Sequence, residues 1–326
     1  MNMRSISSSR LDWLLFLVLG VMWGSSYLFI KIGVEAGLPP FTLVMGRLVI
    51  GGLLLLIVVR VAREPVPRTF KEYAKLAVLG FFGIALPFYL ITVAEASVDS
   101  ALAAVLVSPV PLMVIPLSAI FLRDERLTPA RIGGVLVGFV GVAILVGFDP
   151  ASLGQGDFVA ELLLVASAVS YAASGVYAKK YITGYRPMIP ALFEVMTALL
   201  MISVAAFIFE RPWEAPINFE SVLSVAWLGL FGSGFAFLIF FRLINNWGAT
   251  RTSTVAYLMP VVGILLGALV LSEPVTPDRV LGTALVIGGI ALVNVKRDSI
   301  TGAIASLRGR RPATAEATAE VVTEQR

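Results

Sequence analysis

The chain has 326 residues, of which 58% are hydrophobic and only 14% are charged, and its mean hydropathy is +0.91. Soluble domains carry about 25% charged residues, so this composition excludes a soluble globular protein and indicates a membrane protein with several spans. Without cysteine or histidine the chain forms no disulfide, has no thiolate site and lacks the commonest metal ligand. We therefore expect no cofactor and no metal.

Apolar stretches of the length needed to cross a bilayer, about 20 residues each, recur along the chain and are separated by prolines and charges. The first is too long for a signal-peptide core and should remain as a span. The predicted spans are 11–33, 40–61, 73–95, 99–122, 129–147, 157–181, 187–209, 221–245, 250–271 and 277–296. The sequence predicts an all-α membrane protein with ten transmembrane helices.

Part of the chain occurs twice: residues 79–145 return as residues 228–293. Each copy contributes five spans, an odd number, so the second copy should enter the membrane upside down relative to the first. Inverted repeats place a binding site near the midplane at their interface and allow alternating access. The matched residues are Leu79, Gly80, Phe82, Gly83, Phe88 and Pro111 with Leu228, Gly229, Phe231, Gly232, Phe237 and Pro260, then Glu125, Thr128, Pro129 and Arg131 with Glu273, Thr276, Pro277 and Arg279.

The positions of the 25 lysines and arginines predict the orientation. Most of them lie in the loops and helix ends that are cytoplasmic if the N-terminus is inside, and cytoplasmic loops carry the excess of basic residues. This distribution also argues against a nucleic-acid-binding face. We predict a cytoplasmic tail 1–10, a first repeat 11–147, an external linker 148–156, a second repeat 157–296 and a disordered cytoplasmic tail 297–326. The expected location is the cell (inner) membrane.

Polar and aromatic residues share one face of the first span and recur at equivalent positions in the sixth. Trp23, Ser26 and Tyr27 form the first set, and Tyr171 and Ser174 correspond to Trp23 and Ser26. Paired faces at equal depth favour a cavity shared by both repeats. The alternative is that the aromatic rings pack and the serines bond backbone carbonyls, as is common in membrane helices. Further candidate lining residues are Tyr89, Ser108 and Tyr257.

Several motifs resemble those of the EamA branch of the drug/metabolite transporter superfamily, over most of residues 11–296. The resemblance implies ten helices in two inverted halves, a central cavity formed mainly by spans 1, 3, 4, 6, 8 and 9, and export or exchange of small metabolites. The motifs are Trp23-Gly24-Ser25-Ser26, the stretch from Pro40 to Arg47, Pro111 and Pro260, and the turns Glu125–Pro129 and Glu273–Pro277.

Charged residues within the spans need partners or a function, because a buried charge is costly in a bilayer. Arg47 and Glu194 occupy equivalent positions in the two repeats and have opposite charge. We predict that Arg47 pairs with Glu95 and that Glu194 pairs with Arg242, as gating ion pairs. The alternative is that these side chains extend to the interface without partners. Glu273, just before span 10, is interpreted as structural, because a carboxylate is favoured at a helix N-terminus.

These patterns favour an exporter of small metabolites, foremost amino acids or amphipathic and aromatic compounds, working by alternating access. A facilitator or exchanger of another small metabolite is the alternative. An intramembrane enzyme fits less well, since the sequence has no HExxH motif, no GxSxG elbow and no acidic pair at the centre of two spans. The expected partners are a small-molecule substrate and the lipid bilayer, and the expected state is a monomer or weak homo-oligomer.

Overall fold

The computed structural model describes residues 10–122, 128–146, 156–248 and 252–294, and within these ranges it is helical and contains no β-strand. Seven spans have the length and hydropathy of membrane helices, and two shorter apolar helices lie at Pro129–Leu145 and Thr254–Val270. The predicted all-α membrane fold is confirmed. The unbroken helices are α1 (Arg10–Glu35), α2 (Pro40–Ala62), α7 (Pro129–Val146), α8 (Gly156–Tyr181), α9 (Met188–Phe209) and α14 (Pro277–Asn294).

Two spans contain a widened helical turn at the same place in each repeat. The third span consists of α3 (Phe70–Gly80), a π-helical segment η1 (Phe81–Ala85) and α4 (Leu86–Ala94). Its counterpart consists of α10 (Phe219–Trp227), a π-helical segment η4 (Leu228–Phe235) and α11 (Ala236–Trp247). π-helical turns insert an extra residue into the helix and are frequent at functional sites. The repeated pairs Phe82-Gly83 and Phe231-Gly232 lie within these two π-helical segments and mark them in the sequence.

The fourth and ninth spans are interrupted where the sequence predicted continuous helices. The fourth divides at Ser108 and Pro109 into α5 (Ser100–Val107) and α6 (Val110–Phe121). The ninth begins with a 3₁₀ segment, η5 (Ser253–Tyr257), and continues as α13 (Leu258–Val270). Proline lacks the amide hydrogen that a helix interior requires, which explains the break at Pro109.

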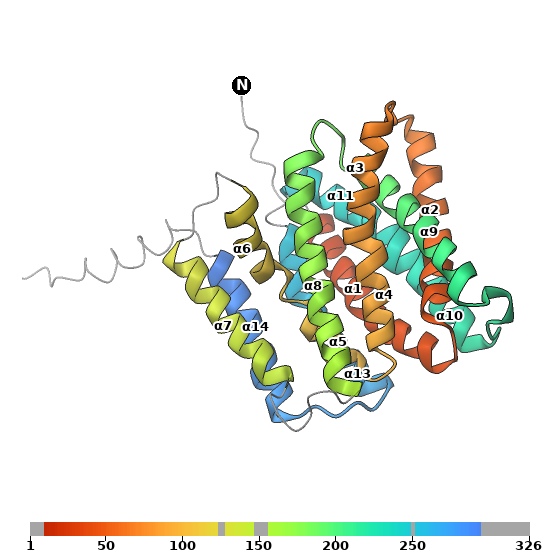
Figure 1. Ribbon diagram of the computed structural model, residues 1–326. Helices are drawn as coiled ribbons and strands as arrows, with labels where there is room; N and C mark the ends of the chain where they lie inside the picture. The colour runs from red at the N-terminus through yellow and green to blue at the C-terminus, as the bar shows by residue number, and fades with distance from the viewer. Residues whose placement is uncertain (1–9, 123–127, 147–155, 249–251, 295–326) are drawn as a thin grey trace, which may run out of the picture.

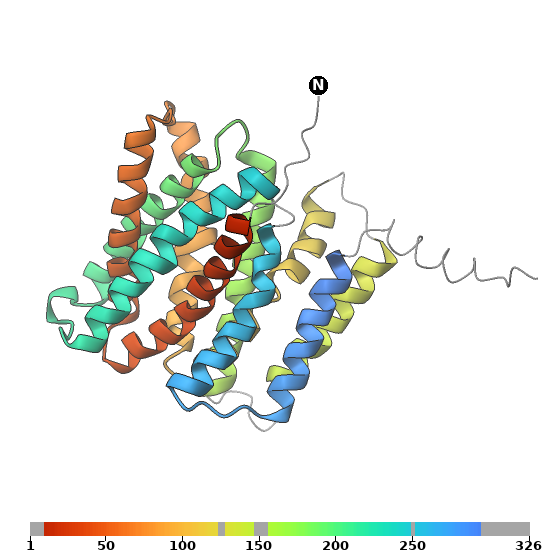
Figure 2. The same cartoon turned by 180° about the vertical axis from the view of Figure 1, so that it is seen from behind.

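Helices α7 and α14 form a close antiparallel pair at one side of the bundle (Figures 1 and 2). A Cβ atom built on Gly134 would lie 2.7 Å from the carbonyl oxygen of Gly289, and one built on Gly141 would lie 2.7 Å from that of Gly282. Only glycine permits this approach. Because α7 and α14 are equivalent helices of the two repeats, their antiparallel course agrees with the predicted inversion.

The outer surface of the bundle is strongly apolar. Val61 and Leu269 are each 79% exposed, and Phe209 is 74% exposed. In water such a surface would drive aggregation, whereas in a bilayer it faces lipid tails. In the part of the chain that the structure describes, the buried apolar side chains form three clusters, and the largest includes residues of α1, α4, α5 and α8. The polar side chains buried within this apolar mass define the candidate site.

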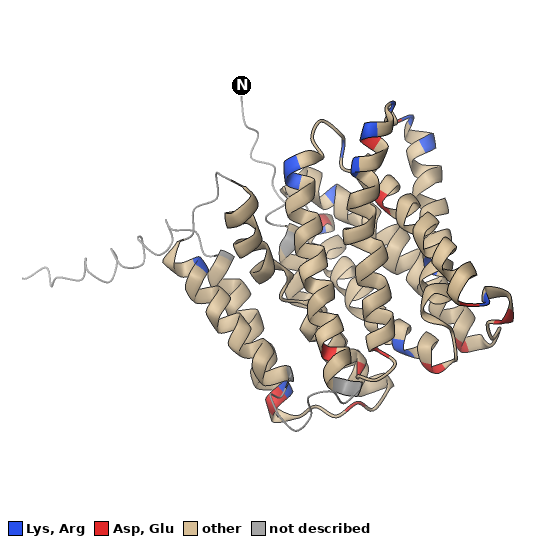
Figure 3. Ribbon diagram, viewed as in Figure 1, with Lys and Arg blue, Asp and Glu red and all other residues tan. Residues whose placement is uncertain are grey.

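Basic side chains gather mainly at one end of the bundle, where α2, α3, α8 and α9 begin or end (Figure 3). If this end is cytoplasmic, single cysteines at Thr69 and Thr183 should react with a membrane-impermeant maleimide only from inside. Cysteines at Ser97 and Ile217 should react only from outside. The cysteine-free background makes the assay clean. Labelling of Thr183→Cys and Ile217→Cys from the same side would contradict the inverted topology.

Candidate functional site

A first polar group, meaning a cluster of polar side chains, forms where α1 and α2 of the first repeat meet η4 of the second. A Cβ atom built on Gly232 would lie 2.9 Å from Ser26 Oγ and 3.1 Å from Arg47 Nη2. Ser26 also donates a hydrogen bond to the Met22 carbonyl, at 3.1 Å. Both side chains are buried, with 8% of Ser26 and 3% of Arg47 exposed. The missing side chain of Gly232 thus makes room for a hydroxyl and a guanidinium to approach the helix backbone.

The equivalent group forms where α8 and α9 of the second repeat meet η1 of the first. A Cβ atom on Gly83 would clash with Glu194 Oε1 and would lie 2.6 Å from Ser174 Oγ. Gly83, Ser174 and Glu194 are the repeat equivalents of Gly232, Ser26 and Arg47. Each repeat therefore contributes a serine and a charged residue that face the π-helical segment of the other repeat. The two groups match in position and differ in the sign of their charge.

Two tyrosines lie within electrostatic range of the charged residues in these groups. The Tyr27 hydroxyl lies within electrostatic range of Tyr171, Glu95 and Arg47. Tyr171 lies within range of both Arg47 and Glu194. Tyr27 is buried in the largest apolar cluster, and half-buried Tyr171 packs against the same cluster. Ser26 thus lies with Arg47 near Gly232, and Ser174 lies with Glu194 near Gly83. Tyr27 and Tyr171 lie within electrostatic range of these charges.

Arg47 does not form the predicted ion pair with Glu95. Its Nε donates a hydrogen bond to Ser233 Oγ at 3.2 Å, and its Cζ lies 4.1 Å from the centre of the Phe88 ring. Both carboxylate oxygens of Glu95 are buried without a hydrogen-bond partner. Ser233 belongs to η4, so the π-helical segment of the second repeat supplies the hydrogen-bond partner of the guanidinium.

Arg242 likewise pairs with a residue other than Glu194. Its Nε lies 3.4 Å from Asp12 Oδ1, and Asn246 Nδ2 donates to both carboxylate oxygens of Asp12, at 3.1 and 3.2 Å. Asp12 is 3% exposed, whereas half of the Arg242 side chain is exposed. Asp12 in the first turn of α1 faces α11, so it is the nearer carboxylate. These contacts tie the first turn of α1 to the C-terminal half of α11.

The remaining candidates contact aromatic rings or the backbone. The Trp23 ring lies 5.1 Å from the Phe240 ring, and Tyr89 stacks on Phe41 with ring centres 4.0 Å apart. Tyr257 donates to the Ile290 carbonyl at 2.8 Å, and Ser108 Oγ donates to the Val105 carbonyl at 2.8 Å. For Tyr257 and Ser108 these contacts match the alternative interpretation, in which the polar atom is satisfied by backbone.

Glu273 is structural, but not for the helix that follows it in the sequence. Its Oε1 accepts hydrogen bonds from Ser100 N and Ser100 Oγ, both at 2.8 Å, and its Oε2 accepts from Ala101 N at 2.9 Å. These donors belong to the first turn of α5. The favourable interaction of a carboxylate with a helix N-terminus therefore links the second repeat to the first.

Sequence reasoning missed Ser233 and Phe88 and treated the paired glycines only as evidence of duplication. Gly83 and Gly232 were the available signal, since a glycine repeated beside a phenylalanine in two spans indicates a close approach in both.

Two clefts open at the basic end of the bundle, and none of the candidate residues lines them. The larger, of about 400 Å³, lies between α2, α3 and α9, and the smaller, of about 340 Å³, borders Glu64 and Arg186.

Comparison with known proteins places these features among membrane transporters. A model of the EamA-like transporter family matches residues 12–147 and again residues 158–295. An uncharacterized transporter of Archaeoglobus fulgidus is 27% identical over 285 residues, covering 87% of this chain and 99% of that protein. The uncharacterized inner membrane transporter YedA of Escherichia coli (strain K12) is 29% identical over 277 residues, covering 84% and 88%.

A third relative, the uncharacterized transporter YvbV of Bacillus subtilis (strain 168), is 30% identical over 307 residues, covering 90% of this chain and 94% of that protein. A solved crystal structure superimposes with a TM-score of 0.62 at 23% identity, covering 87% of this chain and 98% of that one. At that identity the likeness extends to the fold alone. The duplicated family match coincides with the two repeats found in the sequence.

Proposed function

The chain belongs to the EamA-like transporter family, and from that premise we propose that it exports small amphipathic zwitterions, foremost amino acids with apolar or aromatic side chains. The transport is proposed to run by alternating access through the inner membrane, with both chain termini in the cytoplasm. One observation carries the proposal: equivalent positions of the two repeats present an arginine and a glutamate to the two π-helical segments.

Each charge has a chemical counterpart on an amino acid. The Arg47 guanidinium offers planar, paired donors that suit a carboxylate, and Ser233 and Phe88 hold it in place. Glu194 offers an acceptor for an ammonium group, with the Ser174 hydroxyl beside the same glycine. Charge-assisted hydrogen bonds of this kind are about twice as strong as neutral ones. The two charges therefore favour a ligand that carries both signs.

The aromatic residues suit the apolar part of such a ligand. Trp23 lies beside Phe237 and Phe240, and Tyr27 and Tyr171 lie within electrostatic range of Arg47. Small-molecule sites are lined mainly by apolar and aromatic groups, with a few polar groups that set the orientation. Trp23, Tyr27 and Tyr171 are assigned this lining role, and Ser26 and Ser174 are assigned hydrogen bonds to the polar head. Tyr89, Ser108 and Tyr257 are assigned packing.

The architecture supports alternating access. Equivalent helices of inverted repeats exchange roles between two conformations, and transporter sites are typically built on interrupted helices. Here the interruptions lie at η1, η4, the break before Pro109 and η5. The burial of Arg47 and Ser26 supports a state in which this part of the proposed site is closed.

Efflux from proteoliposomes tests the proposal with a panel of related compounds. An apolar amino acid, its amide and its decarboxylated amine share one side chain and an ammonium group, but only the amino acid carries a carboxylate. The zwitterion should leave the vesicles at least about tenfold faster than either analogue, because a site with fixed polar groups rejects a ligand that leaves them unpaired. Equal rates for all three compounds would argue for a less selective metabolite facilitator.

A control separates export from exchange. Efflux of each compound is measured with and without a proton gradient across the vesicle membrane. It is also measured with and without substrate in the external buffer. Dependence on external substrate would identify an exchanger, and no flux of any compound would contradict the proposed substrate class.

A further inference from the structure

A carboxyl group lies buried without a partner at the end of the third span. Glu95 follows α4 and is 0% exposed, and neither of its carboxylate oxygens has a hydrogen-bond partner. An ionised carboxylate in an apolar environment costs far more than a neutral carboxylic acid unless donors surround it. None of the site contacts described above uses this group, so it needs an account of its own.

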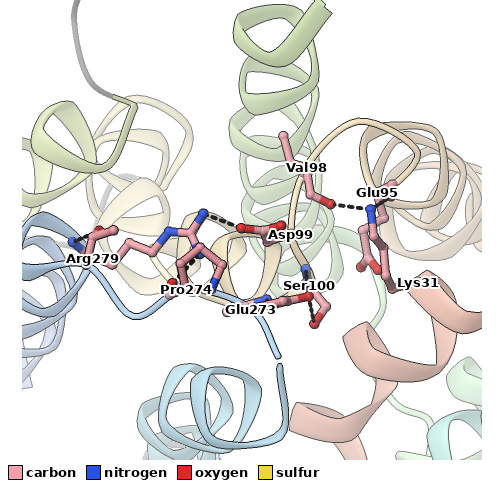
Figure 4. Close-up of polar contacts among 10 residues, drawn as sticks. Lys31, Glu95, Val98, Asp99, Ser100, Glu273, Pro274 and Arg279 are labelled. Atoms are coloured by element: carbon pink, nitrogen blue, oxygen red, sulfur yellow. Dashed lines mark hydrogen bonds and ion pairs between the residues drawn. The ribbon is translucent and has the colours of Figure 1, made fainter. Parts of the chain in front are cut away.

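The lysine nearest to Glu95 bonds the backbone instead of the carboxylate. Lys31 Nζ donates to the carbonyl oxygens of Glu95, at 2.9 Å, and of Val98, at 3.0 Å (Figure 4). It also lies 3.6 Å from the exposed carboxylate of Glu35. These contacts engage the ammonium group of Lys31 with other acceptors. The lysine holds the chain around Glu95 in place while leaving the carboxyl group unbonded.

Two further sets of contacts hold the residues after Glu95 in place. Glu273 binds the first turn of α5, and Arg279 of α14 pairs with Asp99 (Figure 4). Arg279 also donates to the Pro274 carbonyl at 2.8 Å. Contacts from α1 and from the α13–α14 region thus converge on residues 95–101. We name this set of contacts the Glu95 closure.

The charged and titratable groups around Glu95 can be assigned to their elements. Lys31 and Tyr27 come from α1, Arg47 from α2 and Glu273 from the segment before α14. Asp99 is paired with Arg279. On α8, Tyr171 lies within electrostatic range of Arg47 and Glu194. The cations in range act on the carboxyl group through space, and neither carboxylate oxygen receives a hydrogen bond.

We propose that Glu95 is a proton-binding site and that proton uptake by its carboxyl group accompanies formation of the Glu95 closure. When the closure opens, water can reach and solvate the carboxylate, so the O–H bond breaks and the proton passes to water. When it forms again, water is excluded, and the carboxylate takes a proton from water before burial. This coupling does not depend on which substrate the protein carries.

The sign of the pH dependence follows from the difference in bound protons. The closed conformation binds one proton more than the open one, so low pH favours closure and high pH favours opening. For one proton the equilibrium changes by up to about tenfold per pH unit. Opening of the Glu95 closure therefore depends on the pH of the solution on that side of the membrane.

Cysteine labelling measures the coupling without any transport assay. Val98 is 5% exposed within the closure, and Ser97 beside it is exposed. In reconstituted Val98→Cys protein, labelling by an impermeant maleimide should rise with pH, after division by the rate of Ser97→Cys to remove the intrinsic reactivity of the thiol. In Glu95→Gln, which mimics the neutral acid, the corrected rate should stay low at every pH.

A matched variant and a second measurement make the test decisive. Glu35→Gln removes an exposed carboxylate that contacts the same lysine, and it should keep the full pH dependence. Infrared difference spectra should show a protonated carboxylic acid that is lost in Glu95→Gln and kept in Glu35→Gln. The proposal is overturned if Glu95→Gln retains the pH dependence or leaves the carboxylic acid band unchanged. Efflux of zwitterions tests the proposed function separately, so the two results can differ.

Discussion

Arg47→Gln should remove the preference for a substrate carboxylate while leaving uptake of the decarboxylated amine almost unchanged. Truncating one partner of a buried charged contact costs about 2–5 kcal/mol, so KM for the amino acid should rise at least about 30-fold. The glutamine side chain is shorter but remains polar beside Ser233 Oγ, which is the present hydrogen-bond partner of Arg47 Nε at 3.2 Å.

The equivalent residue supplies the matched experiment. Glu194→Gln should raise KM for the amino acid and spare a substrate that carries the carboxylate but no amine. Arg47→Lys should restore little, because an ammonium group does not reproduce the planar fork of a guanidinium. The measurement is KM and kcat in proteoliposomes for the three-compound panel and for the carboxylic acid that has the same side chain but no amine. If both variants slow every compound equally, the charges act in the conformational cycle and not in substrate recognition.

Trp23→Ala and Tyr171→Ala should each reduce efflux at least about tenfold while the purified protein keeps nearly its original thermal stability. The reason is that a ring lining a site contributes to ligand binding, whereas a ring packed in a core costs about 3–5 kcal/mol of folding free energy when it is truncated. Trp23 and Tyr171 are both half-buried. Efflux rates and thermal unfolding of the same preparations check this expectation.

Phe207→Ala is the control, since Phe207 is 59% exposed on the apolar outer surface. It should leave efflux largely unchanged. Strong loss of stability in Trp23→Ala and Tyr171→Ala would instead show that the two rings are packing residues. Normal efflux by both variants would place the ligand elsewhere.

Much of the fold could be predicted from the sequence, because span length and hydropathy follow directly from the thickness of the bilayer. The duplication, with its shared glycines and prolines, was also readable, and the broken and π-helical spans fall on its motifs. The ion pairs could not be predicted, because they depend on rotation about helix axes. Ser233 of η4, and not Glu95, accepts the hydrogen bond of Arg47.

The candidate site shows the same limit. Equivalent faces on α1 and α8 indicated Ser26 and Ser174, and both do face a glycine of the other repeat. Tyr257 and Ser108 satisfied the same pattern but bond backbone carbonyls. Repeat equivalence predicts shared depth, whereas the direction of a side chain depends on local helix geometry.

The matched glycine contacts between α7 and α14 have an evolutionary consequence. Gly134 meets Gly289 while Gly141 meets Gly282, and Gly282 and Gly289 are themselves the counterparts of Gly134 and Gly141. This reciprocal pattern is the isologous contact of a two-fold homodimer, here enclosed in one polypeptide. In a dimer encoded by a single gene, both copies would carry the same residue at the place of Arg47. A single chain that contains both copies can differ at this position, and here one repeat carries Arg47 while the other carries Glu194.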